Sequence, residues 1–205
     1  MTALTRSILR GPSSEARPRV ARPPRTWLLS AWLLVGWLAA GPAGAASAAL
    51  IGQSAPDFAL PAVAGDNVRL SESLGQPVIL TFWSSHCAEC AAQLARLDRL
   101  YDTYRTSGLV VLAVSVDDDM QRAARYARAH PMHFPMLLDQ SKSVSRSYEI
   151  DRLPTTVLID RAGVVRFAHD EYRANDSSYV AQIRTLLDDQ RMQASSGSLT
   201  QAENP

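Results

Sequence analysis

Residues 78–97 read VILTFWSSHCAECAAQLARL, and they predict a strand followed directly by a helix. The first part, Val78–Trp83, is an apolar run dense enough to form a strand buried on both faces of a sheet. Apolar side chains then recur at helical spacing until Gly108, where the helical pattern stops. Cys87 and Cys90 therefore lie where a buried strand gives way to a helix.

A second buried strand follows over residues 109–116, LVVLAVSV. The three acidic residues 117–119 can cap a helix over Met120–Ala129, which Pro131 ends. A strand, a helix and a second strand joined by a helical crossover fit a parallel connection. The core is therefore predicted to be a β-α-β unit.

The remaining segments are short and are separated by turn residues. In chain order they predict a hairpin over 57–70, a strand over 134–138, a helix over 141–148, a hairpin over 155–169 and a last helix over 177–187. Asp176 or Ser177 can cap that last helix, whose apolar face is Val180, Ile183, Leu186 and Leu187. The sequence thus predicts an α/β fold, with a central mixed sheet flanked by helices and an N-terminal β-hairpin extension.

The two cysteines carry the chemistry, and the chain has no others. The unpaired N–H groups and the dipole at a helix start favour a thiolate at Cys87, which lowers the thiol pKa from about 8.5. Residues three apart on a helix are close enough to form a disulfide after a small adjustment of the first turn. Cys87, the more exposed thiol, is expected to attack a partner's disulfide, and Cys90 to resolve the mixed disulfide. A structural zinc half-site is the competing interpretation, but zinc normally takes four ligands.

The N-terminal 48 residues have a different composition from the remainder. The net charge of +1 gives no reason to expect nucleic acid, and six of the 21 basic residues are arginines ahead of the apolar run Trp27 to Ala40. Two A-x-A sites follow, at residues 43–45 and 46–48, so residues 1–48 are interpreted as a cleaved export signal or an uncleaved membrane anchor. We expect a single domain over residues 50–190 and a disordered tail over 191–205.

Four blocks of sequence, in order, resemble the TlpA/ResA-like thioredoxin family, whose members are thiol-disulfide oxidoreductases. The resemblance covers residues 52–187 and rests on residues 55–60, APDFAL, 82–90, FWSSHCAEC, 134–139, FPMLLD, and 153–160, LPTTVLID. It implies a thioredoxin-like fold, with Cys87 as the nucleophile and Cys90 as the resolving thiol. It also implies that Pro154 is a cis-proline facing the disulfide, and that the Leu153 backbone pairs with the substrate chain.

The chain departs from the family at three positions around the cysteines. His86 replaces the usual tryptophan before the first cysteine, Glu89 replaces a proline, and Gln93 replaces a glutamate common in reductive members. A protonated His86 would stabilise the Cys87 thiolate and make the disulfide more oxidising, whereas Glu89 would oppose it. Trp83 is expected to pack beneath the cysteines and to shape the site.

The resemblance favours an extracytoplasmic, monomeric reductant of protein disulfides, for example in cytochrome c or oxidase copper-site maturation. No cofactor or metal is expected, electrons would come from a membrane thiol donor, and the only membrane contact would be an N-terminal anchor. A peroxiredoxin-like peroxidase is an alternative, because Ser84 lies three residues before Cys87, although Leu80 stands where that motif has proline. A Cu(I) metallochaperone that uses both cysteines and His86 is a further alternative.

Other polar residues are interpreted as structural. Residues 117–119 are expected to be a solvated helix cap rather than a cation site. The arginines of the following helix are expected to form a solvated surface, and three histidines have no ligand spacing. These residues are Arg122, Arg125, Arg128, His130, His133 and His169.

Overall fold

The computed structural model describes residues 46–171 and 177–188. The proposed signal or anchor over residues 1–48 lies outside this range except for its end, where Ala46–Leu50 forms a 3-10 turn, η1. The proposed tail over 191–205 and Asp176 also lie outside it. Among the described residues, no helix has both the length and the apolar character needed to span a bilayer.

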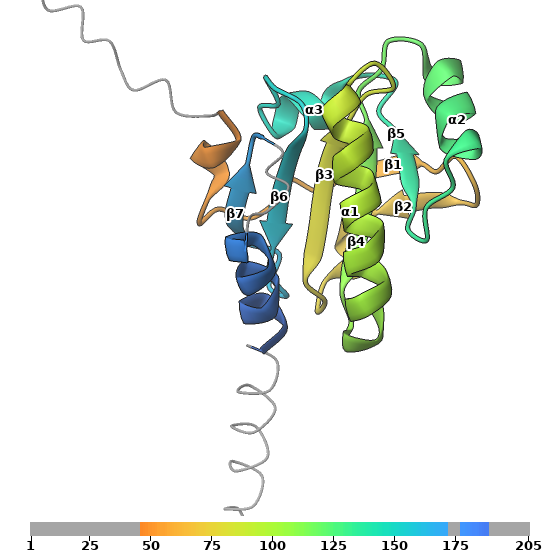
Figure 1. Cartoon of the computed structure of the whole chain (residues 1–205). Coiled ribbons are helices and arrows are strands. Elements are labelled where there is room, and N and C mark those ends of the chain that lie inside the picture. The colour runs from red at the N-terminus through yellow and green to blue at the C-terminus, as the bar shows by residue number, and fades with distance from the viewer. Residues whose placement is uncertain (1–45, 172–176, 189–205) are drawn as a thin grey trace, which may run out of the picture. The chain divides into compact units, whose positions relative to one another are not determined.

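A five-stranded sheet forms the centre of the domain (Figure 1). The strand order is β5-β4-β3-β6-β7, so the first strand of the β-α-β unit is central. β3 pairs in parallel with β4, β4 pairs in parallel with β5, and β6 and β7 are antiparallel to their neighbours. The strands are β3 (Val78–Trp83), β4 (Val110–Ser115), β5 (Met136–Leu138), β6 (Thr155–Ile159) and β7 (Val165–His169). The predicted mixed sheet is therefore confirmed.

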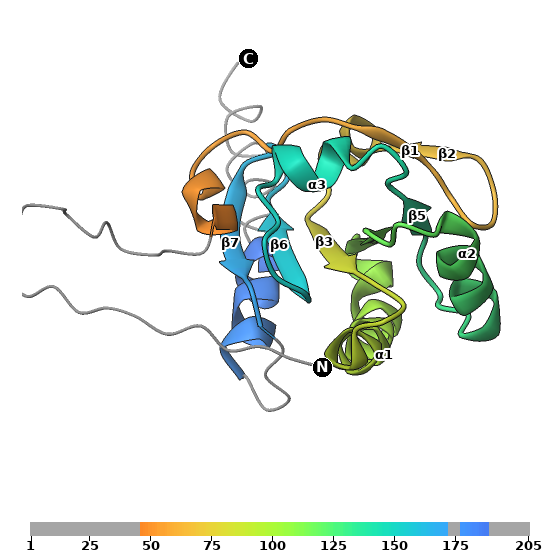
Figure 2. The ribbon, with the colours of Figure 1, turned by 90° about the horizontal axis from the view of Figure 1, so that it is seen from above.

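Helices and a small hairpin cover the two faces of this sheet, as Figure 2 shows from above. One face carries α1, α2 and the helical residues 177–188, and the other carries α3 and the hairpin. The bounds are α1 (Ala88–Tyr104), α2 (Met120–Ala129), α3 (Ser143–Ser147), β1 (Ala59–Pro61) and β2 (Asn67–Arg69), with 3-10 turns η2 (Leu70–Ser73) and η3 (Arg105–Ser107). Every predicted element is present, including the N-terminal hairpin extension.

The apolar run of β3 is buried along its whole length because both faces are covered. Ile79 and Trp83 pack on the α1 side, whereas Leu80 and Phe82 pack against the hairpin side. This alternation is the consequence of the two-residue repeat of a strand. The helical segment of α1 and η3 ends at Gly108, which adopts a left-handed φ of 87°. Glycine accepts this conformation without a steric penalty.

The last helix differs from the prediction in one residue of its buried face. Tyr179 is buried with Ile183, Leu186 and Leu187, whereas Val180 is only half-buried. The Tyr179 ring is covered on its edge by His169 of β7 and on its face by the Arg96 guanidinium. Tyrosine supplies a larger apolar surface than valine, so the helix turns that side toward the sheet.

Candidate active site

Cys87 and Cys90 form a disulfide at the start of α1, with their Cα atoms 5.2 Å apart. Cys87 is the N-cap residue of this helix, and its sulfur accepts a hydrogen bond from the Cys90 backbone N–H at 3.1 Å. Cys87 is half-buried, whereas Cys90 is 1% exposed. The structure thus confirms the strand-to-helix placement and the unequal exposure that the sequence predicts.

A buried carboxylate holds the segment that leads into Cys87. The Asp117 side chain has no exposed surface. Its Oδ1 accepts from the Ser84 hydroxyl at 3.1 Å and from the Ser85 hydroxyl at 2.7 Å, and its Oδ2 accepts from the Ser85 backbone N–H at 2.9 Å. Ser115 at the end of β4 donates a further hydrogen bond to Oδ2 at 2.8 Å. The expectation that Asp117 belongs to a solvated helix cap is therefore wrong.

These hydrogen bonds decide the ionisation of Asp117. Burial raises the pKa of a carboxyl group, but the donors from Ser85, Ser115 and Ser84 outweigh it and lower the pKa of Asp117 below its ordinary value. Asp119 takes the capping role instead, and its carboxylate accepts from the Arg122 backbone N–H at 3.0 Å. Asp118 is fully exposed. Only the third of the three adjacent aspartates is the predicted cap.

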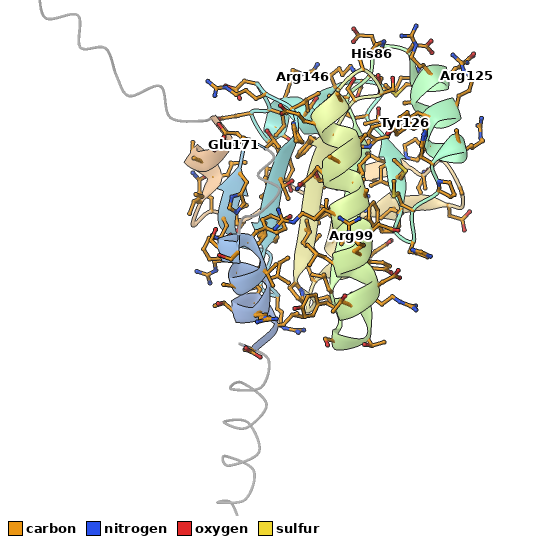
Figure 3. All side chains as sticks on the ribbon, viewed as in Figure 1. His86, Arg99, Arg125, Tyr126, Arg146 and Glu171 are labelled. Atoms are coloured by element: carbon orange, nitrogen blue, oxygen red, sulfur yellow. A yellow bond between two sulfur atoms is a disulfide. The ribbon has the colours of Figure 1, made fainter. Side chains whose placement is uncertain are left out.

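His86 lies between Asp117 and α2, at the end of the molecule where α1 begins (Figure 3). Its side chain is 60% exposed, yet both ring nitrogens have partners. Nδ1 lies 3.2 Å from Asp117 Oδ1, and Nε2 contacts Nη1 of Arg122. Because a guanidinium can only donate, Nε2 accepts and Nδ1 carries the hydrogen that bonds Asp117. The prediction that Arg122 is only a solvated surface residue is therefore wrong.

Neutral polar groups lie under the first turns of α1. Gln93 is buried, and its Nε2 donates to Thr156 Oγ1 at 3.1 Å. Thr156 in turn lies 3.0 Å from Thr81 Oγ1 on the neighbouring strand. Trp83 is 1% exposed and belongs to the same core cluster as Cys90. Its ring packs against that of Tyr126, with the two ring centroids 5.2 Å apart. Trp83 therefore has the predicted packing role.

The Leu153-Pro154 peptide bond is cis, as the resemblance implies. Pairing of Phe82 with Thr155 brings this peptide beside the end of β3, next to the segment that leads to Cys87. Pro154 is buried and Leu153 is half-buried. Glu89 is exposed in the first turn of α1. The residues proposed from sequence thus come from two distant parts of the chain and meet at one end of the sheet.

The three remaining histidines lie in ordinary surroundings, with one exception. His130 stacks on Tyr126, and His169 hydrogen-bonds Gln182 at 2.7 Å. His133 Nδ1 lies 3.1 Å from Asp98 and 3.4 Å from Asp102, a proximity that the sequence analysis missed. The three side chains could present one ligand atom each to a cation, but Asp102 and His133 are exposed and both carboxylates are already paired with His133.

A polar cavity of about 310 Å³ lies beside α1, lined by Gln93, Arg96, His169 and Tyr179 among others. Neither cysteine lines it. The disulfide is instead at the surface end of the helix, which suits a large partner better than an enclosed small molecule.

Two residues of the site, Asp117 and Arg122, were not among the residues proposed from sequence. A weak signal existed for Asp117: it is the first acidic residue after a buried parallel strand, and so lies at the end of the sheet where the neighbouring strand also ends. The Arg122 contact depends on how α2 packs, and the sequence has no local pattern for that.

Comparison with known proteins gives a consistent result. The model of the AhpC/TSA family matches residues 51–168. The thiol-disulfide oxidoreductase ResA of Geobacillus kaustophilus is 34% identical over 120 residues, which cover 58% of this chain and 69% of that protein. ResA of Halalkalibacterium halodurans is 30% identical over 123 residues, covering 60% and 70%.

Solved structures agree. One assigned as the thiol:disulfide interchange protein DsbE of Chlorobium tepidum has a TM-score of 0.64 and 33% identity, covering 67% of this chain and 97% of that chain. The exposed lipoprotein thioredoxin Etrx1 of Streptococcus pneumoniae has a TM-score of 0.56 and 27% identity, covering 64% and 98%. The thioredoxin-like fold is therefore shared with redox proteins.

Proposed function

Because the chain belongs to the AhpC/TSA family and, within it, to the ResA/TlpA-like thiol-disulfide oxidoreductases, we propose that it reduces disulfides of partner proteins outside the cytoplasm. The observation that carries this proposal is the unequal cysteine pair at the start of α1, with Cys87 half-buried as the N-cap and Cys90 buried one turn further on. Only the Cys87 sulfur is accessible to a large partner, either to attack the partner's disulfide or to be attacked by the partner's thiolate.

The reaction then has two exchange steps. The Cys87 thiolate attacks one sulfur of the partner's disulfide, forms a mixed disulfide and expels the other partner sulfur as a thiolate. Cys90, deprotonated, attacks the Cys87 sulfur, closes the Cys87-Cys90 disulfide and expels the second partner thiolate. Two electrons pass from the dithiol to the partner, and a donor dithiol must then restore the reduced enzyme.

The roles of the flanking residues follow from their places. The cis Leu153-Pro154 peptide lies beside the segment that leads to Cys87, so the Leu153 backbone is proposed to pair with an extended substrate chain. Trp83 is buried in the core cluster that also contains Cys90. The exposed Glu89 adds a negative charge in the first turn, which opposes a thiolate and favours a reducing couple.

The proposal also includes the protein's cellular location, its electron donor and its protein substrates. An export signal or anchor over residues 1–48 would place the domain outside the cytoplasm, where a membrane thiol donor would have to supply electrons. Protein disulfides such as those of cytochrome c or oxidase copper-site maturation clients are the proposed substrates. The domain is proposed to act over residues 50–190, as a monomer and without a cofactor.

Neither alternative function gains support from a particular contact. A Cu(I) site would need a histidine lone pair, but Asp117 and Arg122 engage both nitrogens of His86. A peroxidase would need its cysteine to react with peroxide, so peroxide consumption by the reduced protein is the direct control. We expect no consumption above that of the free thiol.

Trapping the mixed disulfide tests the proposal. Reduced Cys90→Ser protein is mixed with oxidised insulin, and non-reducing electrophoresis should show a covalent adduct that dithiothreitol releases. Cys87→Ser is the matched control and should give no adduct, because Cys90 is buried. Equal adduct from both variants, or none from Cys90→Ser while the wild-type protein also fails to reduce insulin, would refute the proposed function.

A further inference from the structure

The segment between β3 and α1 depends on Asp117 for its conformation. Ser84, Ser85 and His86 lie outside both elements, and each donates a side-chain or backbone hydrogen bond to this one carboxylate. The next residue is Cys87. The position of the reactive sulfur relative to the sheet is therefore set through Asp117.

The segment that carries Asp117 is itself held in place. Lys142 Nζ donates to the backbone carbonyls of Val116 and Asp117 and lies 3.3 Å from the exposed carboxylate of Asp118. Ser115 Oγ bonds both the Asp117 carboxylate and the Asp117 backbone N–H, the latter at 3.2 Å. A buried carboxylate is costly unless its donors are fixed, and here they are fixed from both sides.

Charged groups from two elements contact His86: Asp117, which follows β4, and Arg122 of α2. Glu89, exposed in the first turn of α1, lies three residues further along the chain. Arg122 also lies 3.9 Å from Asp119, which faces α2 rather than the imidazole. The carboxylate of Asp117 favours a protonated imidazole, whereas the guanidinium of Arg122 opposes it and uses the Nε2 lone pair.

We propose that Asp117 and Arg122 are positioning residues of the redox site, which clamp His86 as a neutral imidazole and so withhold a positive charge from the adjacent Cys87. This inference rests on the proposed function and adds to it the means by which a histidine beside the nucleophile is kept from making the couple oxidising. A histidinium beside a thiolate would stabilise it and raise the reduction potential.

Removing Arg122 tests the clamp without touching the buried network. In Arg122→Gln the Asp117 carboxylate is left alone with His86 and no guanidinium occupies the Nε2 lone pair, so the imidazole can take up a proton there as the pH falls. Arg125→Gln is the matched control, because Arg125 lies on the same helix and pairs with the same Asp119 at 3.7 Å but has no contact with His86 among those the structure gives it. Both variants lose one positive charge from the exposed side of α2.

The readout is the rate constant for alkylation of the reduced protein by iodoacetamide between pH 5 and 9. Arg122→Gln should react about tenfold faster than Arg125→Gln at pH 5.5, since an opposite charge within a few ångströms lowers a thiol pKa by about one unit or more. The double variant Arg122→Gln/His86→Gln should lose this acceleration. Wild type and Arg125→Gln should share one profile.

Two results would overturn the inference. Identical profiles for Arg122→Gln and Arg125→Gln would show that Arg122 does not control His86. A wild-type profile that already shows faster alkylation on the acidic side, lost in His86→Gln, would show that the imidazole takes up a proton in the native site. Both results concern alkylation alone, so they are separable from failure of the proposed function, which the insulin adduct reports.

Discussion

The two sulfurs of the disulfide face different surroundings. On the Cys87 side the chain gathers a buried carboxylate, an imidazole and a guanidinium within one hydrogen-bonded array, Asp117, His86 and Arg122. Under the turn that carries Cys90 the polar groups are neutral, namely Gln93, Thr156 and Thr81. Charged side chains that can shift the reduction potential of this couple therefore lie on the Cys87 side.

Replacing the carboxylate on the charged side should have the largest effect on stability. In the wild type, the two Asp117 oxygens accept from five donor groups, whereas Asp117→Asn leaves only one acceptor oxygen. Hydrogen bonds to a charged group contribute about 1.5–3 kcal/mol each. We therefore expect the free energy of unfolding to fall by about 3 kcal/mol. Urea denaturation at pH 7 measures it. Asp118→Asn, which removes an exposed charge one residue away, should cost less than about 0.5 kcal/mol.

The pH dependence of stability in wild type and Asp117→Asn tests the ionisation of Asp117. The pKa of Asp117 is lowered in the folded protein, so its stabilising contribution is present above the unfolded carboxyl value of about 3.9 and is lost as pH falls through the lower folded value. Stability of the wild type should therefore drop more steeply below about pH 4 than that of Asp117→Asn. Parallel curves would show that Asp117 is not preferentially ionised in the folded state.

Adding a charge on the neutral side should have an intermediate effect. In Gln93→Glu a carboxylate replaces the amide beside Thr156, one turn beyond Cys90. A nearby negative charge raises a thiol pKa by about one to two units, so for a thiol that starts near pKa 7 the reduction potential at pH 8 should fall by about 20–30 mV. Gln93→Met removes the hydrogen bond without adding charge. An equal fall in that variant would attribute the change to packing.

A change on the far face of the sheet should have the smallest effect. The Tyr148 hydroxyl, fully buried, donates to the Pro56 carbonyl at 2.9 Å. Tyr148→Phe should cost about 1 kcal/mol in thermal or urea unfolding, the value of one neutral hydrogen bond, and leave the reduction potential unchanged. A shifted potential would mean that the two faces of the sheet are coupled.

The sequence predicts the elements well because each carries its own pattern. The apolar run Val78–Trp83, the glycine at 108 and the helix start at Cys87 are local signals, and the structure places all of them as expected. The cysteine pair was found for the same reason. The site roles of Asp117 and Arg122 could not be predicted from the sequence. They depend on contacts with His86 between residues more than 30 positions apart in the chain, which no local pattern contains.

The three adjacent aspartates show this limit in one place. Asp117, Asp118 and Asp119 look alike in the sequence. Asp117 is buried beneath residues 84–86, Asp118 is fully exposed and Asp119 caps α2. Strand alternation and the start of the next helix turn consecutive side chains in different directions. Their separate roles follow from the packing of β4 beside β3, not from residue type.

The equilibrium reduction potential of the Cys87-Cys90 couple, poised against dithiothreitol or glutathione at pH 7, tests the central claim most directly. A neutral His86 gives the Cys87 thiolate no cation, the charges of Asp117 and Arg122 on either side of it offset each other, and Glu89 adds a negative charge in the first turn of α1. We therefore expect a potential near or below that of thioredoxin, about −270 mV, as a reductant requires. A value near that of a strong periplasmic oxidant, about −120 mV, would contradict the reductase assignment and the neutral clamp together.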